Sequence, residues 1–139
     1  MQPRPVDVVS WMIEIERRAA QHEDLLRRVA AKATGHTLER SPLVDLVVDR
    51  HLIIEVKSLE DDVVAQSRTA LAQLYHYRFV YRNILPTARL LVIFGRRPVN
   101  ASTDFVTFLE SCAIAVTWAD ADGFDGTPVA RAAAPWLFG

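Results

Sequence analysis

An aspartate and a Glu-x-Lys triplet stand in the largely apolar segment SPLVDLVVDRHLIIEVKSL; they are Asp45, Glu55 and Lys57. Paired carboxylates are ligands for a hard divalent cation such as Mg²⁺, which keeps several of its waters. A lysine beside such a cation can orient the attacking water and oppose the charge that develops on a phosphoryl group. Because the whole chain contains only two lysines, Lys32 and Lys57, a lysine two residues after a glutamate is not expected by chance. These residue types indicate metal-dependent hydrolysis of a phosphate ester.

Two predicted strands position these side chains. The β-branched runs at Leu43–Val48 and Leu52–Lys57 favour strands, and the three residues between them form a turn. If the last residue of the first strand pairs with the first residue of the second, Asp45 lies directly opposite Glu55, with Cβ atoms roughly 5 Å apart. Like charges so close destabilise a bare sheet, so the spacing indicates a cation between them, with the carbonyl of Val56 as a further ligand.

The remaining elements follow from hydrophobic periodicity and from the residues that begin or end helices. The expected elements are a helix over about residues 6–33, strands at His36–Arg40, Leu43–Val48 and Leu52–Lys57, a helix from Asp61 to about Ile84, a strand at Arg89–Phe94, a helix capped by Ser102 or Thr103 and ending near Ser111, and a strand at Ala113–Trp118. This order predicts an α/β domain with a mixed sheet, in which a hairpin comes first and a right-handed crossover follows.

One face of the second long helix carries groups suited to a substrate. Gln66, Ala70, Gln73 and Tyr77 follow a 4-3-4 spacing, which makes one stripe on a helix. A glutamine amide can donate to phosphate, and a tyrosine can bond phosphate through its hydroxyl or stack on a base. The residues to the sides of this stripe are expected to be core: Leu71, Leu74, Tyr75 and Phe79.

Asp45, Glu55 and Lys57 resemble the D…ExK core of the PD-(D/E)XK nucleases, the restriction-endonuclease-like superfamily. Gln73 and Tyr77, in ALAQLYHYR, look like the QxxxY motif of its RecB-type branch. The resemblance covers about residues 15–120 and departs from the family pattern before the aspartate, where valine replaces proline. It implies an αβββαβ core with a mixed central sheet flanked by helices. The whole chain, 1–139, is then a single nuclease-like domain, in which a C-terminal αβ extension follows the core elements and residues 121–139 form a C-terminal tail.

The resemblance also implies roles for these residues. Asp45, Glu55 and the Val56 carbonyl would hold Mg²⁺ or Mn²⁺, and Lys57 would position the nucleophile. An acid on the first helix completes the family's pattern. Glu23 is the match, with Glu14 and Glu16 as nearby alternatives, and it would support the metal. Gln73 and Tyr77 would steer the scissile strand. The expected substrate is DNA, with RNA as an alternative.

Basic residues gather in one part of the sequence. Residues 63–100 carry six arginines and no acid, although the whole chain has a net charge of −1. The candidate phosphate contacts are Arg78, Arg82, Arg96 and Arg97. The alternative is that this stretch is an ordinary solvated surface. The nucleic acid would then lie across the arginines of the first helix, Arg17, Arg18, Arg27 and Arg28.

Length and composition set the class of protein. A chain of 139 residues with 50% apolar and 24% charged residues has the balance of one globular domain. The single cysteine excludes disulfide scaffolds and cysteine-based zinc sites. No apolar run approaches the length of a membrane span, so we expect a cytoplasmic protein without membrane contacts. The histidines, at 22, 36, 51 and 76, show no metal-ligand spacing and are expected at the surface or in turns.

Two other functions stay open at this stage. A nuclease fold that has lost cleavage could bind nucleic acid or a protein partner. A structure-selective junction resolvase of similar size is the other alternative, although such enzymes carry a broader basic surface than a net charge of −1 provides. Since one domain leaves no room for a separate recognition module, we expect a homodimer, or a subunit or domain of a larger assembly.

Overall fold

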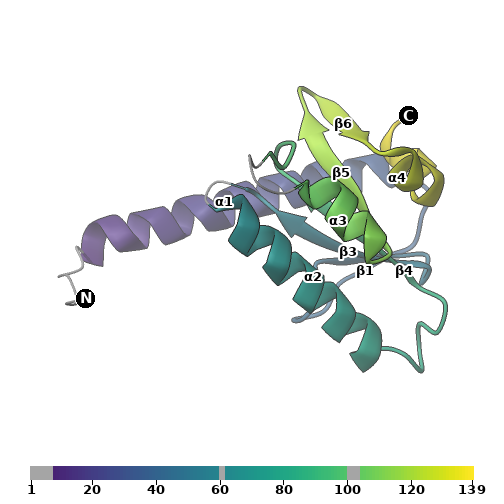
Figure 1. Ribbon diagram of the computed structural model, residues 1–139. Coiled ribbons are helices and arrows are strands. Elements are labelled where there is room, and N and C mark those ends of the chain that lie inside the picture. The colour runs from purple at the N-terminus through teal and green to yellow at the C-terminus, as the bar shows by residue number, and fades with distance from the viewer. Residues whose placement is uncertain (1–7, 60–61, 100–103) are drawn as a thin grey trace.

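A mixed six-stranded sheet forms the centre of the protein (Figure 1). The computed structural model describes residues 8–59, 62–99 and 104–139. The strands are β1 Leu38–Glu39, β2 Leu46–Val48, β3 Leu52–Lys57, β4 Arg89–Phe94, β5 Ile114–Asp120 and β6 Gly123–Gly126, and they lie in sequence order across the sheet. β3, β4 and β5 are parallel to one another, whereas β1–β2, β2–β3 and β5–β6 are antiparallel pairs.

Helices cover both faces of this sheet (Figure 1). They are α1 Val8–Lys32, α2 Val63–Val80, α3 Phe105–Ser111, α4 Pro128–Ala133 and the 3₁₀ turn η1 Pro135–Leu137. Buried residues of α2 and α3 pack on one face, and those of α1, α4 and η1 pack on the other. β4 is a continuous apolar run from Leu90 to Phe94 because both of its faces are covered. The mixed α/β architecture expected from the sequence is therefore confirmed.

Element bounds differ from the expected ones for local reasons. β2 begins at Leu46 rather than Leu43, because the Ser41 hydroxyl accepts the N–H groups of Leu43 and Val44 and holds that stretch in a turn. α2 is capped by Asp62, whose carboxylate accepts two N–H groups of the first turn. The helix ends at Val80, a turn before the expected Ile84. Asp61 lies outside the described residues.

The third helix starts later than expected. Asp104 is its cap and accepts the N–H of Thr107 at 3.1 Å. The expected caps, Ser102 and Thr103, lie outside the described residues, as does the side chain of Glu14 on α1.

Residues beyond β5 dock on the domain. β6, α4 and η1 form a C-terminal extension where the sequence predicted only a tail, and Ala130, Ala134 and Leu137 are buried in one cluster with residues of α1 and the sheet. The Nζ of Lys32 on α1 donates to the carbonyl of Gly139 at 3.1 Å. Within the part of the chain that the structure describes, no helix is long and apolar enough to span a bilayer.

Candidate active site

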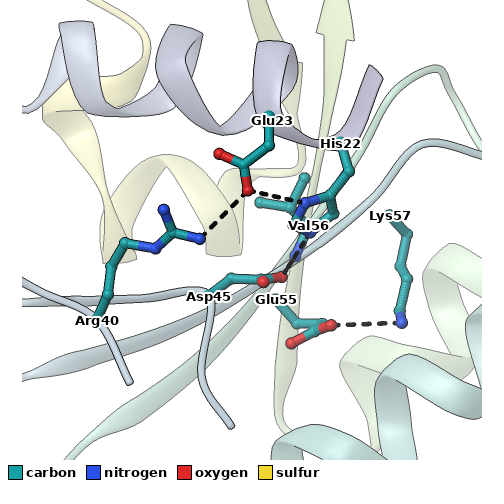
Figure 2. A network of polar contacts seen from close by, with 7 residues as sticks. All are labelled: His22, Glu23, Arg40, Asp45, Glu55, Val56 and Lys57. Atoms are coloured by element: carbon teal, nitrogen blue, oxygen red, sulfur yellow. Dashed lines mark hydrogen bonds and ion pairs between the residues drawn. The ribbon is translucent and has the colours of Figure 1, made fainter. Parts of the chain in front are cut away.

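The β2–β3 hairpin brings Asp45 next to Glu55 (Figure 2). Val48 pairs with Leu52, and the ladder continues to Leu46 opposite Ile54, which is the register that the three-residue turn predicts. Asp45 directly precedes the ladder, and its Oδ2 accepts the backbone N–H of Val56 at 2.9 Å. This bond fixes the carboxylate at the carboxyl end of β3, beside Glu55.

Glu55 is a buried acid beside a lysine. Only 4% of the residue is exposed, and its Oε1 lies 3.3 Å from Nζ of Lys57 on the same face of β3. Its Oε2 has no hydrogen-bond partner among the described residues. Burial, together with the charge of Asp45, raises the pKa of Glu55 to about 7, although the Lys57 ammonium opposes this rise.

Asp45 differs from Glu55 in its protonation. Burial raises its pKa, but hydrogen bonds from His22 and from the Val56 N–H outweigh burial, and the net pKa lies below the ordinary value. The two neighbouring carboxylates therefore differ in protonation near neutral pH, with Asp45 ionised and Glu55 half-protonated. Such a pair gains most from a nearby cation, which would let both ionise together.

His22 of α1 completes this cluster, although the sequence predicted it as a surface or turn residue. Its Nε2 lies 3.2 Å from Oδ2 of Asp45, and this hydrogen bond raises the pKa of the imidazole. The signal was present in the helical spacing, since His22 precedes the buried Leu25, Leu26 and Val29 by three, four and seven residues and shares their face. The sequence argument considered metal-ligand spacing alone and therefore missed the contact of this histidine with Asp45.

Glu23 lies one step away from the carboxylate pair. Its Oε1 is 3.8 Å from Nδ1 of His22 and 3.4 Å from a guanidinium nitrogen of Arg40 (Figure 2). The structure brings it into contact with His22 and not with Asp45 or Glu55. Any effect of Glu23 on the carboxylates passes through the imidazole, whose other nitrogen bonds Asp45.

These donors fit a Mg²⁺ or Mn²⁺ ion in part. The buried, unpartnered Oε2 of Glu55 and the adjacent Asp45 supply two carboxylates. The carbonyl of Val56 leaves the strand on the same edge as its N–H, which points at Asp45. Mg²⁺ is commonly held by one or two carboxylates and keeps several waters. Among the described residues there is no cluster of three or more His, Cys, Asp or Glu side chains arranged to hold a metal, so water or substrate oxygens would have to complete the shell.

A hollow of about 360 Å³ opens beside the acidic pair, at the carboxyl end of β3. α1 contributes Arg18 and His22 to its lining, β3 contributes Glu55 and Lys57, and α2 contributes Gln66. The reactive groups therefore face an open space between the two helices that cover opposite faces of the sheet.

The chain has no match among protein-family models, curated proteins or solved structures. The functional argument therefore depends on the residues and geometry of the site.

The α2 stripe lies close to the carboxylates, and two of its four residues, Ala70 and Tyr77, are buried. Tyr77 is 5% exposed, and burial followed by the charges of Glu55 and Asp45 raises the pKa of its hydroxyl to about 12. Oε1 of Gln73 is buried and unpartnered among the described residues, while Oε1 of Gln66 accepts the N–H of Leu59. Tyr77 is thus a protonated phenol beside the acids, with its ring packed in the core rather than open for stacking.

Only some of the side chains that flank the stripe are in the core, whereas all four were predicted there. Leu74 is buried and Leu71 packs on the core, as expected. The prediction of core positions for Tyr75 and Phe79 was wrong, since both are exposed, Phe79 to 63%. The guanidinium of Arg78 lies over the ring of Tyr75 at 4.6 Å, and that of Arg82 lies over Phe79 at 4.1 Å.

Arg96 and Arg97, the other two predicted phosphate contacts, directly follow β4, and their side chains contact different parts of the molecule. Arg97 lies over the ring of Trp118, with its guanidinium carbon 5.3 Å from the ring centroid. Nε of Arg96 donates to the carbonyl of Leu59 at 2.9 Å, and the side chain lines a hollow beside Ser58. Arg96 therefore lies near the site, while Arg78 and Arg82 lie at the opposite end of α2 from Gln66.

Proposed function

We propose that the protein is a divalent-metal-dependent nuclease of the PD-(D/E)XK kind, acting on DNA. The observation that carries the proposal is the pairing of Asp45 with Glu55, whose Oε2 is buried without a partner among the described residues and whose Oε1 contacts Lys57. Two buried neighbouring carboxylates cost free energy unless a proton or a cation lies between them. A site that receives a cation explains this arrangement.

Each residue has a defined part in this proposal. Asp45, Glu55 and the Val56 carbonyl would hold the ion, which would supply Lewis-acid polarisation of the phosphate and a more acidic water. Lys57 provides a fixed positive charge beside the reacting phosphate, where negative charge develops on the oxygens during attack by water. His22 keeps Asp45 ionised and oriented through its 3.2 Å contact. Tyr77, protonated beside the acids, can donate to a phosphate oxygen.

Cleavage assays with matched lysine variants test this proposal. Plasmid and linear DNA are incubated with Mg²⁺, Mn²⁺, Ca²⁺ or EDTA. Lys57→Ala is expected to lose cleavage while keeping metal and DNA binding, because lysine acts on the nucleophile and not as a ligand. Lys32→Ala is the control, since Lys32 is the other lysine of the chain and bonds Gly139 in a different part of the molecule. Cleavage in EDTA, or a Lys57→Ala variant within about threefold of wild type, roughly 0.6 kcal/mol in the barrier, would contradict it.

A second candidate is a nuclease fold that binds nucleic acid without cutting it. It is favoured by the hydrogen bonds that Oδ2 of Asp45 already makes, to Val56 and His22, and by the partial ligand set among the described residues. Calorimetric titration with Mg²⁺ and Mn²⁺ separates the two, because only the nuclease needs a bound ion. Absence of ion binding together with DNA binding would favour the second candidate.

A further inference from the structure

Three hollows meet at Ser58, just beyond the carboxyl end of β3. Their volumes are about 360, 430 and 630 Å³, and Ser58 lines all of them. The two larger hollows also share Arg17 and Gly95. They form one continuous depression, which runs from Glu55 past the end of β4 and along α1.

Two main-chain segments lie close together in this depression, at Gly95 and Ser58. Gly95 follows β4, and a Cβ built on it would lie 2.4 Å from the carbonyl oxygen of Ser58. The N–H of Gly95 donates to the carbonyl of Lys57 at 2.7 Å, so the ends of the two strands touch here. A glycine at this point lets the two main-chain segments approach closely, which holds the loop after β3 against the end of β4.

The walls are strongly basic. The charged lining residues are six basic side chains and two acidic ones: Arg17, Arg18, Arg27, Arg28, Lys57 and Arg96 against Asp24 and Glu55. The whole chain, by contrast, has more acidic than basic residues. We call this surface the arginine groove. Its excess of positive charge fits a polyanion and not an apolar or cationic ligand.

Arg96 is held in place at the groove. Its Nε donates to the carbonyl of Leu59, and the N–H of Leu59 donates to Oε1 of Gln66, both at 2.9 Å. The loop after β3 thus links the end of β4 to the first turns of α2. A guanidinium has five N–H donors, so one anchoring bond leaves it able to donate to a phosphate.

We propose that the phosphodiester backbone of a nucleic-acid strand lies in the arginine groove, with Arg17 and Arg96 bound to phosphates next to the one at Asp45 and Glu55. This inference rests on the proposed function, because it takes the acidic pair as the point of cleavage. It places the strand across the ends of β3 and β4 and along α1. The arginines at the far end of α2, Arg78 and Arg82, then lie away from its path.

Binding without cleavage tests the path. Fluorescence anisotropy of a labelled oligonucleotide, single-stranded and as a duplex, is measured in EDTA between about 50 and about 200 mM salt. Arg17→Ala with Arg96→Ala is expected to weaken binding about tenfold at the lower salt. The slope of log affinity against log salt is expected to fall by about 0.7 to 0.9 for each phosphate that the protein no longer neutralises. The oligonucleotide that shows the larger loss of affinity identifies the strand form that the groove holds.

Two further double variants complete this test, one as a control with the same loss of charge and one as a second variant of the groove. Arg50→Ala with Arg89→Ala removes the same charge at the amino ends of β3 and β4, opposite the groove, and is expected to change neither affinity nor slope. Arg17→Ala with Arg18→Ala leaves the bond from Arg96 to Leu59 intact and is expected to weaken binding, which separates binding of phosphate from disruption of the loop.

The outcomes distinguish this inference from the proposed function. If both groove variants bind like the Arg50/Arg89 control, or if wild type does not bind either oligonucleotide, the groove is not the path and the inference is overturned. The same holds if Arg78→Ala with Arg82→Ala is the variant that loses affinity. If the groove variants lose affinity while wild type cleaves nothing with any metal, the path stands and the nuclease proposal fails.

Discussion

Replacing Glu55 by glutamine should make the metal-free protein more stable at alkaline pH. Glu55 is buried beside the ionised Asp45, and burial together with that charge raises its pKa to about 7 from the ordinary 4.5. The folded protein therefore keeps this proton up to about pH 7, while the unfolded chain releases it above pH 4.5. Because the folded state binds more protons in this window, the free energy of unfolding falls as the pH rises through it.

The size of the effect follows from the two pKa values. At about 1.4 kcal/mol per pH unit, ionising Glu55 costs the folded protein about 3 kcal/mol once the pH exceeds about 7. Glutamine has the same shape and no charge, so Glu55→Gln should be about 3 kcal/mol more stable than wild type near pH 8 and within about 1 kcal/mol of it near pH 5. The raised pKa of His22 acts in the same direction. The free energy of unfolding of the variant should therefore still fall as the pH rises, but less steeply than that of wild type.

Urea and thermal unfolding in EDTA at about pH 5 and about pH 8 measure this difference. For a domain of this size, about 3 kcal/mol corresponds to roughly 10 °C in Tm. Glu16→Gln, a change at an exposed carboxylate of α1, is the control and should leave both the stability and its pH dependence as in wild type. If Glu55→Gln is no more stable than wild type near pH 8, the acidic pair is not a source of strain in the fold, and the reasoning fails.

Three further predictions concern the same region. Gly95→Ala should lower the free energy of unfolding in urea by about 1–3 kcal/mol, because the new Cβ would lie 2.4 Å from the Ser58 carbonyl oxygen. Gly123→Ala, whose Cβ would have nothing within 4 Å, should lower it less. Asp62→Ala should lower the free energy of unfolding by about 1 kcal/mol through loss of the α2 cap, and Asp62→Asn should retain most of it. Asp45→Asn should abolish cleavage on gels yet bind DNA in EDTA as tightly as wild type or slightly more tightly, since a negative charge is removed; weaker binding would count against this.

The hairpin part of the site was predictable from the sequence because its geometry is local. Side-chain alternation and a three-residue turn fix the pairing of Val48 with Leu52, and the structure confirms it. The approach of His22 to Asp45 depends instead on how α1 is rotated and placed over the sheet. Helical spacing puts His22 on the buried face of α1, but the position of that face over Asp45 is set by packing against distant segments.

The arginines show a second limit of sequence reasoning. A stretch of six arginines without acids suggests one basic surface, but α2 and β4 run in different directions and distribute them. Arg78 and Arg82 lie over aromatic rings at the end of α2, whereas Arg96 reaches the groove. Charge along the chain predicts the charge of a surface only where consecutive residues share a face.

The docking of α1 against the C-terminal extension bears on the order in which the site can assemble during synthesis. Arg28 of α1 donates to the carbonyls of Ala121 and Gly123, and Lys32 donates to that of Gly139, residues made about a hundred positions later. The helix that carries His22 is translated before the hairpin, yet part of the surface that holds it, in α4 and η1, is translated after β5. A nascent chain can form the hairpin with Asp45 and Glu55 before the extension that helps to hold α1 has been made. In nascent chains that lack the extension, the acidic pair should therefore form beside a less firmly held histidine, and any cleavage by the proposed site should be weaker.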